Sequence, residues 1–187
     1  MNKVFLAVVI VGGIILVAGW FFVNNSTQTE VSIPTRPTKT ISSFEECAAS
    51  GAPVAESYPR MCRDAKGQIF IESIGNASDQ ADKIRVLSPT PNQVLTSPLH
   101  LLGEARGNWF FEASFPVVLL DSAGQEIARG RATADGEWMT TEFVPFRATL
   151  PFTKPLGETG TLLLERDNPS GLPENADALT LPVRFTP

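Results

Sequence analysis

The sequence predicts a mainly β chain whose C-terminal part, residues 83–187, folds as an antiparallel β-sandwich. Apolar and polar residues alternate there with the period of two that places successive side chains on opposite faces of a strand. Gly, Pro, Asn and Asp separate these segments at intervals of about 8 to 15 residues, and no helical period of useful length interrupts them. Seven or eight strands in about a hundred residues fit two packed antiparallel sheets.

Composition and charge limit the class of partner. The chain has 187 residues, with 15 Lys and Arg against 20 Asp and Glu. At about 150 residues per domain, this length predicts one ordinary domain with appendages. The mildly acidic balance provides no basic surface for phosphate contacts, so we expect no nucleic-acid partner.

Residues 1–23 are expected to anchor the chain in a lipid bilayer. The run that begins at Val4 and ends at Val23 contains no charged residue, and a helix of that length spans about 30 Å, the thickness of a bilayer core. Lys3 precedes the run and the next positive residue is Arg36, which predicts a single-pass protein of the cell membrane with a cytoplasmic N-terminus and an extracytoplasmic bulk. A cleaved signal peptide is the alternative, but its apolar core has only about 7 to 15 residues.

Two polar segments, residues 24–43 and residues 75–82, are expected to be linkers. The first is rich in Ser, Thr, Asn, Gln and Pro and reaches roughly 25 Å as a flexible chain. Between the two linkers, residues 44–74 are expected to form a small module. It has a short helical turn that Gly51 ends and two short strands within residues 58–72.

The small module contains both cysteines of the chain, Cys47 and Cys62. On the extracytoplasmic side two thiols predict a disulfide, which would stabilise a unit too small to bury a sufficient core. A loop of this size contributes on the order of 3 kcal/mol in the chain-entropy model. Zinc binding is the weaker alternative, because zinc takes four ligands and no histidine lies nearby.

The strands expected after the second linker follow the alternation closely. In order they are 83–86, 99–105, 115–121, 125–134, 144–150, 161–166 and 179–186. Residues 115–121 form a continuous apolar run, as a central strand does. Pro182 within the last strand predicts an edge position or a bulge.

An ordered series of motifs within these strands and their turns resembles a known family. The motifs are LSPTPNQV at 87–94, SPL at 97–99, GEARG at 103–107, WFFE at 109–112 and GEW at 136–138. They resemble the immunoglobulin-like domain associated with bacterial spore germination proteins, over residues 84–185. The resemblance implies an immunoglobulin-like sandwich in a bacterial cell-envelope protein. It does not imply a germination role, because the usual germination partner domain is not recognisable in this chain.

The sequence holds no recognisable catalytic constellation. His100, its single histidine, lies in an expected strand, where a solvated or cross-strand-paired side chain is the favoured interpretation. A disulfide would remove both cysteines as nucleophiles. We therefore expect a non-enzymatic protein without a cofactor or metal, and a cell-wall-acting enzyme that uses carboxylates is a less favoured alternative.

The first candidate binding site is the run of aromatic residues Trp109, Phe110 and Phe111. In a strand, Trp109 and Phe111 share one face only if Phe110 takes the other. With Trp138, the group either stacks on a sugar or protein partner or fills the sandwich core, and core packing is the favoured interpretation. Phe110, or whichever of these aromatic residues faces outward, is the residue whose substitution tests a partner surface.

Two further loops are candidates for binding. Residues 168–177 are rich in turn formers and include Asn168 and Glu174. Calcium binding by Asp167, Glu174 and Asp177 is one interpretation of this loop, and a solvated connector is the favoured one. Arg60 lies in the loop that the disulfide braces, as the cleavage-site mimic of a protease inhibitor does. We expect binding or assembly with an envelope protein or a cell-wall polymer, and inhibition through Arg60 is the alternative.

Overall fold

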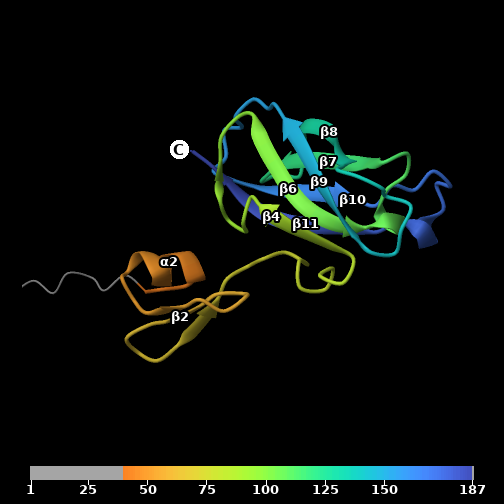
Figure 1. Ribbon diagram of the computed structural model, residues 1–187. Helices are drawn as coiled ribbons and strands as arrows, with labels where there is room; N and C mark the ends of the chain where they lie inside the picture. The colour runs from red at the N-terminus through yellow and green to blue at the C-terminus, as the bar shows by residue number, and fades with distance from the viewer. Residues whose placement is uncertain (1–39, 187) are drawn as a thin grey trace, which may run out of the picture. The chain divides into compact units, whose positions relative to one another are not determined.

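The computed structural model describes residues 40–186. The expected membrane anchor, from Val4 to Val23, and almost all of the first linker lie outside these residues. Within residues 40–186, no helix is long and apolar enough to cross a membrane. The described part consists of a small module and a β-sandwich (Figure 1).

The small module pairs one short helix with a three-stranded antiparallel sheet. Its elements are α2 Phe44–Ala49, β1 Val54–Ala55, β2 Met61–Arg63 and β3 Ile69–Ile71, with strand order β1-β2-β3. The helix begins after Ser43, whose side chain accepts a hydrogen bond from the Glu46 amide, as an N-cap residue does. The sequence predicted α2, β2 and β3, whereas β1 is only two residues long and carries no periodic signal.

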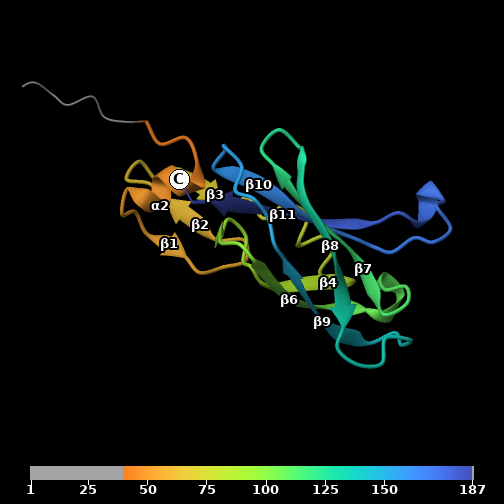
Figure 2. The ribbon, with the colours of Figure 1, turned by 90° about the horizontal axis from the view of Figure 1, so that it is seen from above.

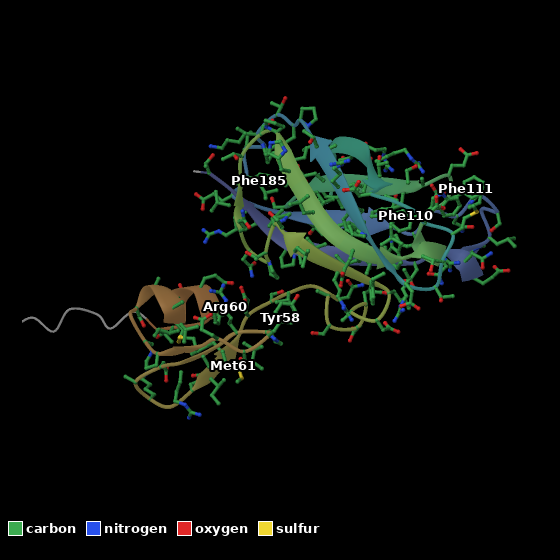
Figure 3. All side chains as sticks on the ribbon, in the orientation of Figure 1. Tyr58, Arg60, Met61, Phe110, Phe111 and Phe185 are labelled. Carbon is green, nitrogen blue, oxygen red and sulfur yellow. A yellow bond between two sulfur atoms is a disulfide. The ribbon has the colours of Figure 1, made fainter. Side chains whose placement is uncertain are left out.

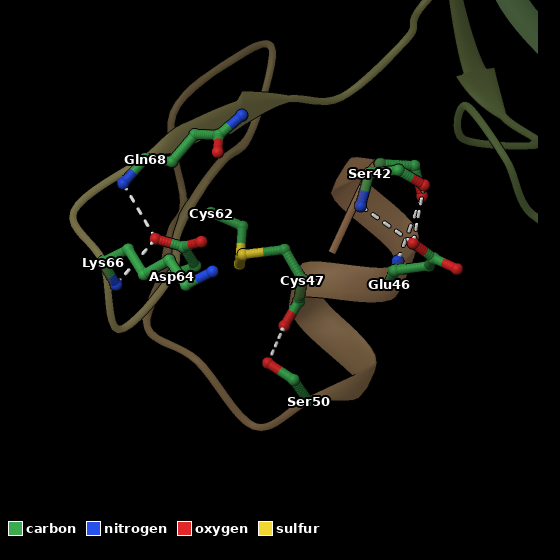
Figure 4. The surroundings of a disulfide bond; sticks show 9 residues. Ser42, Glu46, Cys47, Ser50, Cys62, Asp64, Lys66 and Gln68 are labelled. Atoms are coloured by element: carbon green, nitrogen blue, oxygen red, sulfur yellow. Dashed lines mark hydrogen bonds between the residues drawn. A yellow bond between two sulfur atoms is a disulfide. The ribbon is translucent and has the colours of Figure 1, made fainter. Parts of the chain in front are cut away.

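The disulfide between Cys47 and Cys62 joins α2 to β2 and confirms the predicted pairing (Figure 4). Both cysteines are fully buried, and only Phe44 and Phe70 complete the buried cluster around them. Asp64 Oδ1 accepts hydrogen bonds from the amides of Lys66 (2.9 Å) and Gln68 (2.8 Å), which closes the turn between β2 and β3. Four buried residues are a small core, so the covalent bond is the main restraint on this fold.

Eight strands form the sandwich. They are β4 Ile84–Ser88, β5 Val94–Leu95, β6 Leu99–Arg106, β7 Ser114–Asp121, β8 Glu126–Ala134, β9 Phe143–Leu150, β10 Thr159–Glu165 and β11 Ala178–Phe185. The hydrogen-bonded order is β4-β6-β9-β8-β7-β10-β11-β5. Seven of these strands coincide with the segments expected from the sequence.

This continuous sheet folds back on itself to make two layers. β8 pairs with β7 over most of its length but with β9 only at Thr133 and Ala134, so the β8–β9 contact is the corner between the layers. Figure 2 shows β4, β6 and β9 on one side and β10 and β11 on the other. A mainly β, sandwich-like architecture was therefore predicted correctly.

The core lies between the two layers and is built from the alternate residues of each strand. Phe115 of β7 is central: its ring lies 4.9 Å from that of Phe146 and 5.3 Å from that of Phe110, between ring centroids. The buried aliphatic residues around them are Ile84, Leu99, Leu101, Val117, Leu119, Val144, Leu162, Leu164, Leu179, Leu181 and Val183. The period-two pattern predicted these inward positions because each strand has one face on the core.

The short strand β5 was not expected from the sequence. It pairs in parallel with β11, at Arg184 and Phe185 only. Pro182 therefore lies in β11 beyond the reach of β5, and its carbonyl accepts a hydrogen bond from the Asn92 amide. Since the amide nitrogen and carbonyl of one strand residue point the same way, the ring nitrogen of Pro182 removes no bond from the β10–β11 ladder.

Residues 74–82, which we expected to belong mostly to a linker, form successive turns against the sandwich. Ile74 and Ala77 are buried in the core cluster. The side chain of Asn76 donates to the Ala178 carbonyl (2.9 Å) and accepts from the Thr180 amide (2.7 Å). The side chain of Asn76 therefore ties this polar segment to the backbone of β11.

Candidate functional site

Three loops meet at one end of the sandwich, and together they carry every binding residue proposed from the sequence for that domain. They are residues 107–113 between β6 and β7, 135–142 between β8 and β9, and 166–177 between β10 and β11. Hydrogen bonds join the first and third: the Asp167 amide donates to the Trp109 carbonyl and Arg166 Nε donates to the Asn108 carbonyl, both at 3.0 Å. We call these three loops the loop end; Phe110 and Phe111 mark it in Figure 3.

The first loop is not a strand. Residues Gly107–Trp109 form a 3-10 helix, and Glu112 and Ala113 have positive φ values of 49° and 60° that turn the chain sharply. Strand alternation therefore does not apply between them. Trp109 and Phe110 are both buried, with 1% and 4% exposed, and Phe111 is 41% exposed.

The outward aromatic residue, which the sequence left open, is not Phe110. Its ring packs on Phe115 inside the core, and the outward aromatic residue is its neighbour Phe111. Trp138 of the second loop is partly buried against the same core. Trp109, Phe110 and Trp138 thus pack in or against the core, as the favoured interpretation expects. Phe111 is the aromatic side chain of this group that is accessible to a partner.

Each of the three loops carries one large apolar side chain that is exposed. Phe111 is 41% exposed in the first loop, Met139 78% in the second and Leu172 48% in the third. Loop tips of a sandwich are usually polar, because the apolar residues of the domain are used in its core. These three exposed apolar side chains at one end of the sandwich are candidates for contact with a partner.

The third loop is ordered by its own side chains. Asn168 Nδ2 donates to the Leu172 carbonyl (2.8 Å), and Ser170 Oγ donates to Asn168 Oδ1 (2.5 Å). Glu174 lies in the short 3-10 helix Pro173–Asn175 and is exposed. Asn168 therefore shapes the loop that presents Leu172, and Glu174 offers a carboxylate at its surface.

The acidic residues considered for calcium are engaged elsewhere. Asp167 forms an ion pair with Arg131, and Asp177 forms one with Lys83 at 2.7 Å. Burial acts to raise the pKa of Asp177, but hydrogen bonds from Lys83 and Gln80 outweigh it and hold that pKa below its usual value. Among residues 40–186, no group of three potential ligands is placed to hold a metal ion.

A polar hollow of about 640 Å³ lies beside the third loop. Its lining includes Pro116, Glu165, Arg166, Asp167, Asn168 and Asp177. Glu165, Asp167 and Asp177 each pair with a cation, whereas Arg166 donates to the Asn108 carbonyl and belongs to none of these ion pairs. The lining therefore offers hydrogen-bonding groups to a polar ligand or a peptide backbone.

In the small module, the arginine considered for protease inhibition is held by a carboxylate. Arg60 donates from Nε and Nη2 to the two oxygens of Glu72, at 2.9 and 2.6 Å, and its guanidinium lies 5.2 Å from the centroid of the Phe44 ring. An inhibitor of trypsin-like proteases must offer a free guanidinium to the specificity pocket. The geometry of Arg60 does not favour that use.

The single histidine has no catalytic surroundings. His100 lies on the exposed face of β6, and its Nδ1 is 3.4 Å from Thr149 Oγ1 across the β6–β9 pair. This is the cross-strand pairing favoured from the sequence.

Comparison with known proteins assigns the sandwich. No curated protein and no solved structure matches the chain. Residues 83–171 match the family described as the immunoglobulin-like domain of bacterial spore germination. The matched range runs from the start of β4 through β10. It includes the first two loops of the loop end and the first part of the third. Over residues 83–171, the sandwich is thus similar to the immunoglobulin-like domain of bacterial spore germination.

Proposed function

We propose that the chain is a non-enzymatic cell-envelope protein whose immunoglobulin-like domain binds an envelope protein or a cell-wall polymer through the loop end. The family of residues 83–171 is not a family of known enzymes. Loops at one end of a rigid sandwich are where immunoglobulin-like domains place their binding residues. The proposal therefore assigns the strands to support and the three loops to recognition.

The observation that carries the proposal is the set of three exposed apolar side chains at the loop end, together with a hollow beside the third loop. Phe111, Met139 and Leu172 come from different loops, and Asn168 and Asp167 line the hollow next to the third loop. Apolar area supplies affinity, and hydrogen-bonding groups supply orientation, in most protein–ligand contacts. A sugar polymer or a protein loop offers both kinds of group.

Extracytoplasmic placement is supported by two observations. The apolar run that ends at Val23 is long enough for an anchor, and the only positive residue of the chain before Arg36 lies on its N-terminal side. Cys47 and Cys62 form a disulfide, a bond typical of proteins outside the cytosol. Inhibition through Arg60 is not favoured, since Glu72 already occupies the guanidinium.

A binding experiment with the full-length chain tests the proposal. The double variant Phe111→Ser, Asn168→Ala should recover at least about fivefold less envelope protein in a pull-down, or sediment at least fivefold less with purified peptidoglycan, than the wild type. Leu156→Ser is the matched control, because Leu156 is fully exposed in the β9–β10 loop at the opposite end of the sandwich. Equal recovery by the double variant and the control would exclude the loop end as the binding surface.

A further inference from the structure

The outer face of the three-stranded sheet in the small module is apolar, although it is not covered by any described residue. Cys62 and Phe70 point inward to the disulfide and α2. The opposite face carries the exposed residues Pro53, Ala55, Met61, Arg63, Ile69 and Ile71. An antiparallel sheet with one free face normally alternates apolar-in and polar-out, and this sheet does not.

The strand register gathers these side chains into two rows across the sheet. Ala55 opposes Met61, which in turn opposes Ile71. In the second row Arg63 opposes Ile69, and the Arg63 amide donates to the Pro53 carbonyl. The two rows border a hollow of about 310 Å³ whose lining is mostly apolar.

The exposed area at this face is large for so small a unit. Met61 is 39% exposed, Ile69 48% and Ile71 61%. Figure 3 labels Met61 on β2 and Tyr58 in the loop before it, where Tyr58 is 63% exposed. Contiguous apolar area of this kind marks an interaction site on a soluble domain, whereas single exposed residues do not.

The single charge within the two rows indicates what the occupant carries. Arg63 donates only to the Gly67 carbonyl, at 3.3 Å, and no carboxylate among residues 40–186 pairs with it. Lys66 adds a second cation at the turn that follows β2. A partner that places a carboxylate opposite Arg63 would satisfy this guanidinium while its apolar groups fill the hollow.

The charge of the whole module distinguishes a protein partner from a lipid surface. Residues 41–74 contain five acidic residues, Glu45, Glu46, Glu56, Asp64 and Glu72, against three basic residues, Arg60, Arg63 and Lys66. A net charge of −2 opposes adsorption to anionic lipid, which attracts clusters of basic residues. Local positive charge within a negative module instead favours a partner with one well-placed acidic group.

We propose that the outer face of this sheet, formed by Pro53, Ala55, Met61, Arg63, Ile69 and Ile71, binds an apolar peptide segment of a partner protein that carries a carboxylate opposite Arg63. The surface is separate from the loop end, so the module and the immunoglobulin-like domain provide two different binding sites.

A peptide selection on the full-length chain, immobilised through a C-terminal tag, tests this inference. Random peptides displayed on phage are selected on the wild type after depletion on Ile69→Lys, and enriched sequences are synthesised for affinity measurement. We expect apolar peptides with one Asp or Glu. Ile69→Lys and Arg63→Glu should each weaken the affinity for these peptides about tenfold or more. A peptide whose acidic residue is replaced with Lys should bind the Arg63→Glu variant again, because the two charges are exchanged.

Two control variants carry the same chemical changes elsewhere. Leu156→Lys and Lys154→Glu alter exposed residues of the β9–β10 loop and should leave peptide affinity unchanged. Intact disulfide, measured by mass after alkylation, verifies that the module variants are folded. The inference is overturned if no peptide is enriched, if Arg63→Glu binds the peptides as the wild type does, or if Ile69→Lys instead abolishes binding to phosphatidylglycerol vesicles. None of these results bears on the loop end, which all four variants leave intact.

Discussion

Arg60 and Glu72 form a two-point ion pair in which the arginine is accessible and the carboxylate is not. The side chain of Glu72 is 4% exposed and that of Arg60 42%. Asn92 Nδ2, from the loop before β5, lies 3.3 Å from Glu72 Oε1. The hydrogen bond from Arg60 is the main reason why the pKa of Glu72 lies below its usual value, and it outweighs the opposing effect of burial.

This pair predicts that the module is sensitive to acid. Because the folded-state pKa of Glu72 is lowered, its stabilisation is complete above the usual carboxyl pKa of about 4.3 and is lost as pH falls through the folded value. Glu72→Gln should destabilise the β2–β3 amides by about 1 to 3 kcal/mol at pH 7 and reduce their acid dependence. Hydrogen exchange of these amides between pH 3 and 7 measures both effects.

The exposed pair of Arg147 and Asp135 is the control for this prediction. Their side chains are 68% and 57% exposed, so Asp135→Asn should change stability by less than about 0.5 kcal/mol. An acid dependence of the β2–β3 amides that is unchanged in Glu72→Gln would show that another carboxylate is responsible.

Reduction of the disulfide should unfold the module and leave the sandwich folded. The 15-residue separation of Cys47 and Cys62 corresponds to about 3 kcal/mol in the chain-entropy model, and the module has only two other buried residues in its cluster. With dithiothreitol, trypsin should cut rapidly after Arg60, Arg63 and Lys66, whereas residues 83–186 stay resistant. Equal cleavage rates with and without the reductant would mean that the apolar contacts suffice.

The three adjacent aromatic residues should differ sharply in their contribution to stability. Trp109→Ala and Phe110→Ala each empty a buried site and should cost about 3 to 5 kcal/mol. Phe111→Ala removes a side chain that is 41% exposed and should cost less than about 1 kcal/mol. Urea unfolding of the three variants measures the difference, and a loss at Phe111 as large as that at Phe110 would contradict the assignment of Phe111 to the surface.

The same tryptophan has a further property that can be measured. Trp109 Nε1 is buried and has no hydrogen-bond partner among the described residues. Trp109→Phe therefore removes an unsatisfied donor together with some packing, and should cost much less than Trp109→Ala.

The strands of the sandwich were predictable because each has one face on the core. Apolar and polar residues therefore alternate along the sequence of each strand. Leu99, Leu101 and Ala105 show it within β6 alone. The sequence left open which aromatic residue faces outward. The local backbone contains a 3-10 helix and two residues with positive φ, and neither Glu112 nor Ala113 signals such a turn. No sequence pattern could have identified Phe111 as the exposed aromatic residue.

Long-range polar contacts were equally hidden from the sequence. Asn76 and Thr180 are about a hundred positions apart, and their pairing depends on where residues 74–82 cross β11. Met61, Ile69 and Ile71 were visible as strand residues, but only the register shows that they share an uncovered face with Arg63. The alternation of residues along a sequence identifies a strand, but it does not show which face of the strand is exposed to solvent.

The side chain of Asn76 should be a main determinant of how residues 74–82 are held on the sandwich. It donates to the Ala178 carbonyl, and its Oδ1 accepts from both the amide and the hydroxyl of Thr180. Asn76→Ala leaves the Thr180 amide and the Ala178 carbonyl without these partners and should cost about 1 to 3 kcal/mol. Asn168→Ala, which removes bonds within an exposed loop, should cost less than about 1 kcal/mol.

Hydrogen exchange distinguishes the mechanism of this effect from general destabilisation. If Asn76 holds the segment in place, Asn76→Ala should raise exchange first at the amides of Thr180, Gln80 and Ile84, the last two of which donate to carbonyls of this segment. The amides of β6 and β9 should keep wild-type protection, since their pairing involves neither residue. Uniform loss of protection across the sandwich would instead make residues 74–82 part of its cooperative core.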